Sequence, residues 1–155
     1  MSSYLSFYLV PKKTKTRYTY DENGGHEEEI KISDGKPLYL MCYSRNTDIY
    51  QSFNETLNVA YAGNEEKYTE LTYEDAKRVV SEFENDIKIT EKRLETDYKM
   101  LKEGGYHDDL FSEIQGMEDH LSEQKESLEE LKYIASSVYE WTNNTDFEKV
   151  LINID

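Results

Sequence analysis

Three histidines, one cysteine and many carboxylates are the residues of this sequence that could do chemistry. A protein zinc site draws on closely spaced Cys and His ligands, but His26, His107 and His120 stand apart from one another and from Cys42. The sequence has no glycine-rich phosphate loop and no nucleophile elbow of the Gly-x-Ser-x-Gly type. Carboxylates are so frequent that none can be chosen as a catalytic pair. We therefore expect no catalytic residue, no cofactor and no metal, and we expect that the protein is not an enzyme.

The tripeptide His107-Asp108-Asp109 could bind a cation weakly. The three residues directly precede an amphipathic segment, and polar side chains at that position commonly cap the first turn of a helix. We interpret them as a solvated helix start and keep them as candidate contacts for a partner.

Charge gives the clearest indication of what the protein binds. Asp and Glu number 33 against 18 Lys and Arg, so the net charge is -15. Such a field repels phosphate backbones, which argues against direct nucleic-acid binding and favours a protein partner with a basic surface. We also keep self-association open. The partner-binding candidates are carboxylates of one predicted helix: Glu118, Asp119, Glu123 and Glu126.

Cys42 lies in the apolar stretch 38–43 and, as the single cysteine, cannot form an internal disulfide. We interpret it as a small buried hydrophobe in a strand of a cytoplasmic protein. No apolar run approaches the roughly 20 residues that span a bilayer, so no membrane partner is expected. The opening 1–10 lacks the basic start of a signal peptide.

The elements outside the long helices are predicted from alternation and turn residues. Residues 3–10 alternate with Leu5, Phe7 and Leu9 on one face, which is typical of a half-buried strand. Two strands at 14–20 and 27–32 should form a hairpin that turns at Asn23-Gly24, with Lys12, Lys13, Lys15 and Arg17 opposite Glu27, Glu28 and Glu29. The stretch 38–43 is apolar on both faces and is expected in the middle of the sheet. A short helix at 48–57, a loop at 58–71 that crosses the sheet, and a closing strand at 147–154 complete this part.

The segment 72–142 predicts a long antiparallel helical hairpin. Two apolar heptad series occupy its halves, and Gly104-Gly105 separates them. When the chain folds back at these glycines, facing positions keep one register that sets Leu94 opposite Met117 and Tyr73 opposite Val138. The fold class is therefore α+β, a small antiparallel β-sheet with a short helix and a protruding, coiled-coil-like helical hairpin. We expect a single domain over 1–155, with 1–71 and 143–155 forming the sheet part and 72–142 the hairpin.

The opening Met1-Ser2-Ser3-Tyr4-Leu5-Ser6-Phe7-Tyr8-Leu9-Val10-Pro11-Lys12-Lys13, the stretch Leu40-Met41-Cys42-Tyr43-Ser44-Arg45-Asn46 and the ending Phe147-Glu148-Lys149-Val150-Leu151 together resemble small uncharacterised proteins of tailed bacteriophages. This resemblance implies no known active site, so it assigns a role to no residue. It implies that the protein acts in the host cytoplasm or in the virion.

Two functional hypotheses follow from these observations. The first is a non-enzymatic protein-interaction or structural protein that uses the helical hairpin and the sheet edge as binding surfaces. The resemblance implies that such a protein is of phage origin. The alternative is an acidic mimic of nucleic acid that inhibits a nucleic-acid-binding host protein.

Overall fold

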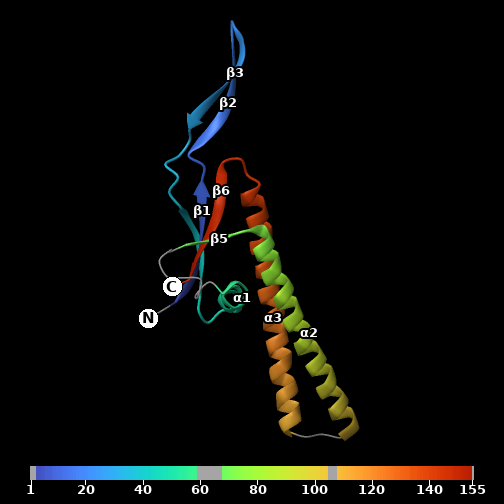
Figure 1. The fold of residues 1–155 in the computed structure, drawn as a ribbon. Helices are drawn as coiled ribbons and strands as arrows, with labels where there is room; N and C mark the ends of the chain where they lie inside the picture. The colour runs from blue at the N-terminus through green and yellow to red at the C-terminus, as the bar shows by residue number, and fades with distance from the viewer. Residues whose placement is uncertain (1–2, 59–67, 105–107, 155) are drawn as a thin grey trace.

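The computed structural model describes residues 3–58, 68–104 and 108–154. It confirms the α+β class: one sheet, a separate two-stranded ribbon and three helices, of which two are long and pack against each other (Figure 1). The elements in chain order are β1 (Tyr4–Pro11), β2 (Thr14–Asp21), β3 (Gly24–Lys31), β4 (Leu38–Ser44), α1 (Asp48–Leu57), β5 (Thr69–Leu71), α2 (Tyr73–Gly104), α3 (Asp108–Thr142) and β6 (Phe147–Ile154).

The main sheet is antiparallel, with strand order β4-β1-β6-β5. The predicted alternation of β1 is confirmed, since Leu5, Phe7 and Leu9 are buried. Val150 and Ile152 of β6 are buried beside them. These side chains form one core with residues of all three helices, so one face of the sheet is covered by helices.

The short helix and the closing strand are where the sequence predicts them. Thr47 caps α1, because its Oγ1 accepts a hydrogen bond of 3.2 Å from the Tyr50 amide. The prediction of a loop over 58–71 is wrong at its C-terminal end, since Thr69–Leu71 forms the strand β5, which pairs with β6. Three residues are too few to show a period in the sequence. Residues 59–67 of that prediction lie outside the described residues.

The position predicted for the stretch 38–43 is wrong. Strand β4 is at the edge of the sheet, and β1 and β6 are the central strands. The prediction that Cys42 is buried is also wrong: it is exposed and lies opposite Ser6, on the face that none of the described helices covers.

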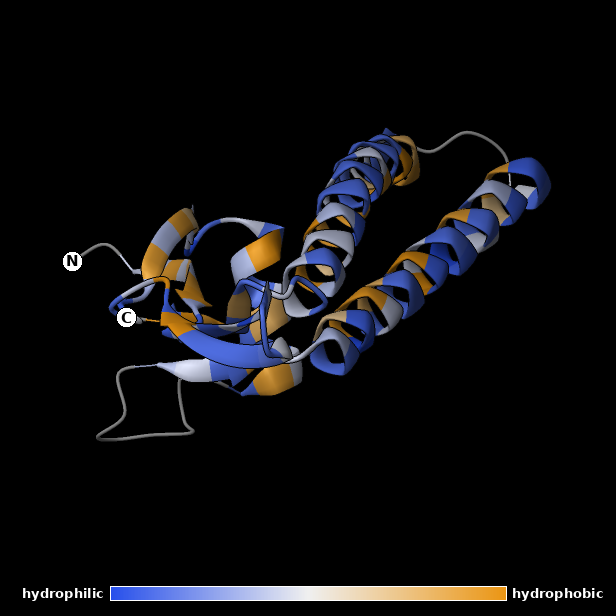
Figure 2. Cartoon of the chain, turned by 90° about the horizontal axis from the view of Figure 1, so that it is seen from above, coloured by the Kyte–Doolittle hydropathy of each residue, from blue (hydrophilic) through white to orange (hydrophobic). Residues whose placement is uncertain are grey.

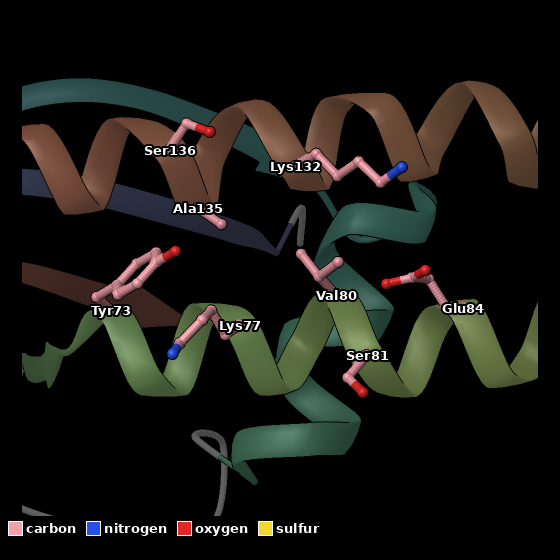
Figure 3. A pocket seen from close by; sticks show the side chains of 8 residues that line it. All are labelled: Tyr73, Lys77, Val80, Ser81, Glu84, Lys132, Ala135 and Ser136. Atoms are coloured by element: carbon pink, nitrogen blue, oxygen red, sulfur yellow. The ribbon is translucent and has the colours of Figure 1, made fainter.

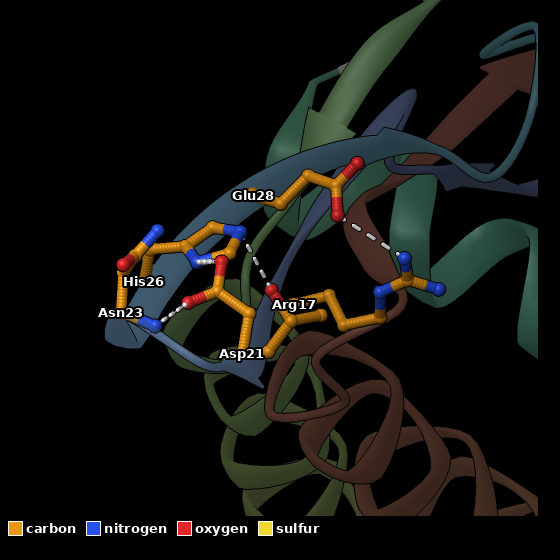
Figure 4. A network of polar contacts seen from close by, with 6 residues as sticks. Arg17, Asp21, Asn23, His26 and Glu28 are labelled. Carbon is orange, nitrogen blue, oxygen red and sulfur yellow. Dashed lines mark hydrogen bonds and ion pairs between the residues drawn. The ribbon is translucent and has the colours of Figure 1, made fainter.

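The predicted hairpin of β2 and β3 is confirmed, although its turn is at Glu22-Asn23 and not at Asn23-Gly24, and it forms its own two-stranded sheet beyond the main one (Figure 1). Of the expected cross-strand pairs, Arg17 and Glu28 meet at 3.1 Å, whereas Lys15 binds Asp146 at 3.3 Å instead. At the turn, Asp21 accepts from the Asn23 amide and lies 3.4 Å from the ring of His26 (Figure 4). His26 of β3 therefore links the two strands of the ribbon next to their turn.

The helical hairpin begins with a capping box. The Asp75 amide donates to Thr72 Oγ1 at 3.1 Å, and the Thr72 amide donates to the Asp75 carboxylate at 3.4 Å. Helix α2 has 32 residues and ends at Gly104, as predicted, and α3 has 35. At 1.5 Å per residue the two helices are about 48 and 52 Å long. The turn between them lies outside the described residues.

The contacts between α2 and α3 agree with the predicted register. At the root, the rings of Tyr73 and Tyr139 pack with centroids 5.0 Å apart, one residue from the predicted pair. Farther out, Arg93 meets Glu113 at 3.7 Å and Tyr98 donates to Glu118. The predicted register places Arg93 opposite Glu118 and Tyr98 opposite Glu113. Each observed contact is shifted from this pairing by about five residues along α3, one toward each end of the helix. The two shifts cancel, so their mean agrees with the predicted register.

The seam between the helices has two layers. On the side toward α1 and the sheet, Phe83, Leu131 and Val138 are buried. On the other side Ile87, Leu94 and Ala135 are buried as well, whereas Val80, Leu121 and Leu128 are only partly buried. Apolar residues recur along both helices, which diverge toward the end that carries Gly104 (Figure 2).

Candidate functional site

The acidic residues of α3 form a straight stripe. Asp119, Glu123 and Glu126 follow one another at intervals of four and three residues, which places them on one side of a helix. Glu130 continues the series by four residues. All four are exposed, and the structure shows no ion pair for any of them within the residues it describes. We call Asp119, Glu123, Glu126 and Glu130 the acidic stripe.

The structure does not bring Glu118 into this stripe. One residue before Asp119, it is rotated by about 100° around the helix. Its carboxylate accepts a hydrogen bond from the Tyr98 hydroxyl of α2. Glu118 therefore joins the two helices of the hairpin, and the predicted set of four carboxylates separates into three on the stripe and one at the seam.

A hydrogen bond connects the acidic stripe to the edge of the sheet. The Tyr43 hydroxyl of β4 donates to the carboxylate of Glu130. Burial raises the pKa of Tyr43 above its usual range, and the bond to Glu130 raises it further, so this hydroxyl keeps its proton at neutral pH. Nearby, Ser127 donates to Asp48 of α1 across 2.9 Å. The stripe thus starts where α3, β4 and α1 meet.

Strand β4 is at the edge of the sheet. Among the strands that the structure describes it pairs with β1 only, and its residues Leu38–Ser44 include no charged side chain. Leu38 is 51% exposed and Tyr39 is 59% exposed. An uncharged, partly apolar strand edge is a template for pairing with another extended segment.

The open face of the sheet beside β4 is aromatic. Tyr8 packs edge-on between Tyr39 and Tyr68, with ring centroids 5.8 and 5.1 Å away. Tyr39 and Cys42 lie opposite Tyr8 and Ser6 of β1 on this face, and the Cys42 side chain raises the pKa of Tyr39. The aromatic row extends the apolar character of the β4 edge.

The predicted helix start at Asp108 and Asp109 is confirmed, since both lie in the first turn of α3 and are exposed. Negative charge is favourable there because of the helix dipole. His107 lies outside the described residues. Within 3–58, 68–104 and 108–154 no group of three His, Cys, Asp or Glu side chains could hold a metal ion.

Two residues of this surface were missed by sequence reasoning. Glu130 could have been found, because it continues the spacing of Glu123 and Glu126. Tyr43 could not, because nothing in the sequence links a strand residue to a helix residue so far along the chain.

None of the helices that the structure describes is long and apolar enough to cross a membrane. No protein family, curated protein or solved structure was found to match this chain.

Proposed function

We propose that this chain is a non-enzymatic protein-interaction protein that binds an extended, basic segment of another protein. The observation that carries the proposal is the hydrogen bond between Tyr43 and Glu130, which joins the edge strand β4 to the acidic stripe. Main-chain hydrogen bonds along β4 would supply affinity, as in other cases of strand addition. The carboxylates of the stripe would select for lysine and arginine and speed association.

Mimicry of nucleic acid has less support. The acidic stripe carries four charges over residues 119–130, which corresponds to one charge per about 5.5 Å of helix. A single DNA strand carries one phosphate charge per about 3.4 Å. The stripe is therefore sparser than the backbone it would imitate, and a generic basic segment is the better fit.

A short synthetic peptide of alternating lysine and valine tests the proposal by isothermal titration calorimetry. Changing Asp119→Asn, Glu123→Gln and Glu126→Gln together should weaken binding about tenfold, since each exposed ion pair contributes about 0.5 kcal/mol. Methylating alternate backbone amides of the peptide should weaken binding as well, because the ladder along β4 cannot then form.

The matched control neutralises three carboxylates elsewhere, by Glu22→Gln, Glu140→Gln and Glu148→Gln, all of which are exposed. This variant should keep most of the native affinity. An equal loss in both triple variants would mean that the peptide senses only net charge, and the proposed site would be rejected.

A further inference from the structure

A groove runs along the hairpin on the side away from the sheet. Its widest part, at the root, is a cavity of about 550 Å³ between Tyr73, Val80 and Ala135 (Figure 3). Two smaller cavities follow toward the hairpin tip. Glu84 lines both the first and the second cavity, and Glu91 lines both the second and the third, so the three are continuous.

The floor of this groove is the layer of the helical seam that lies away from α1 and the sheet, in which Val80, Leu121 and Leu128 are partly buried and the other apolar residues are buried. It consists of one residue per heptad from each helix: Val80, Ile87 and Leu94 from α2, and Leu121, Leu128 and Ala135 from α3. An apolar strip of this kind between two antiparallel helices is the surface on which further helices pack in a bundle.

The walls of the groove carry charges of both signs, unlike the acidic stripe. Lys125 and Lys132 are the only lysines or arginines of α3, and both line the groove. The wall on α2 includes Glu84, Glu91 and Glu95, together with Lys77 and Lys88. With four lysines against three glutamates, the groove is close to neutral in a chain whose net charge is -15.

We infer that a second copy of this chain occupies the groove, so that two hairpins form an antiparallel four-helix bundle. Two copies of an acidic chain repel over most of their surfaces, and the groove is a region where that repulsion is absent. A two-fold axis along the hairpin would place α2 of one copy against α3 of the other. Glu84 and Glu91 would then face the partner's Lys125 and Lys132, which is a self-complementary arrangement.

The rest of the fold permits this assembly. The strands and α1 lie behind the two helices when the groove is viewed from its open side (Figure 3). Phe83 of α2, on the side of the seam toward α1, lines a cavity with Ser52 and Thr56 of α1. The sheet of each copy would therefore point outward, and the acidic stripe and β4 would stay free for the binding proposed above.

Two charge-reversed variants test the inference by sedimentation equilibrium. One carries Glu84→Lys and Glu91→Lys, the other Lys125→Glu and Lys132→Glu, and all four positions are exposed, so folding should be retained in the circular dichroism spectrum. The native chain should be a dimer. Each variant alone should be a monomer, because like charges then meet across the bundle. An equimolar mixture of the two should recover the dimer, because each α2 again faces an α3 of opposite charge.

A variant of the acidic stripe, Asp119→Lys with Glu123→Lys, is the control and should remain a dimer whatever its effect on peptide binding. A monomeric native chain would overturn the inference and would leave the groove to a helix of a different protein. Dimers of both charge-reversed variants would also overturn it, because the interface would then lie elsewhere. Either result leaves the proposed function of the stripe unaffected.

Discussion

Phe7→Ala is expected to lower the free energy of unfolding by about 3–5 kcal/mol, the usual cost of removing a buried aromatic ring. Phe7 is fully buried in the central strand β1. Its ring packs edge-on against Phe53 of α1 at 5.4 Å and against Tyr43 of β4 at 6.0 Å. The change therefore empties the point where the sheet, its edge strand and the short helix meet. Because a domain is stable by only about 5–15 kcal/mol, urea unfolding should show a large shift.

The matched control is Tyr20→Ala on the ribbon, where the side chain is 81% exposed. It should change the unfolding free energy by no more than about 0.5 kcal/mol. Phe7→Leu, which keeps most of the volume, should cost less than the alanine variant. Equal midpoints for Phe7→Ala and Tyr20→Ala would contradict the described core.

Asp97→Leu is expected to raise the free energy of unfolding by about 1–3 kcal/mol, the cost of a buried polar group without a partner. Asp97 lies in the helical seam and is 7% exposed, and its Oδ2 has no hydrogen-bond partner in the described part of the chain. An apolar side chain at this heptad position would pack against α3 instead. Thermal unfolding followed by circular dichroism measures the gain.

Two further variants separate burial from helix propensity. Asp97→Ala removes the carboxylate without adding volume and should also be stabilising. Asp86→Ala, at an exposed position of the same helix, gains the same helix propensity and should change the stability by less. If Asp97→Ala and Asp86→Ala gave the same increase, the carboxylate of Asp97 would not carry the expected cost.

Local patterns in the sequence predict most of the elements of this fold. The heptads of α2 and α3, the cap at Thr72 and the alternation of Leu5, Phe7 and Leu9 are properties of neighbouring residues, so the sequence reveals them directly. The hairpin register was predictable for the same reason, because the phases of the two heptad series determine which residues face each other when the helices pack antiparallel.

The order of the strands could not be predicted in this way. A strand that is apolar on both faces is central in a sheet covered on both sides, but this sheet has one open face. Central strands such as β1 and β6 therefore alternate, with Ser6 and Asn153 on the open face. The unbroken apolar run of β4 instead marks an edge strand, in which Leu38, Tyr39 and Cys42 are exposed.

The candidate binding surface was predicted in part for related reasons. Asp119, Glu123 and Glu126 share one side of a helix, which follows from their spacing alone. The separation of Glu118 toward Tyr98 depends on which way α3 is rotated against α2. The junction of Glu130 with Tyr43 depends on where the sheet docks, and a contact between residues so distant in sequence leaves no local pattern.

Every surface proposed above depends on α2 and α3 lying side by side in one register, and a short chemical crosslink measures this most directly. In a Cys42→Ser background, cysteines at Arg93 and Glu113 replace an ion pair of 3.7 Å. A short bismaleimide should join them within one chain, as intact mass would show, whereas Ile89→Cys, at a residue 62% exposed on α2, should not join Glu113→Cys. Absence of the 93–113 link within the chain, or equal yields from both pairs, would contradict the hairpin.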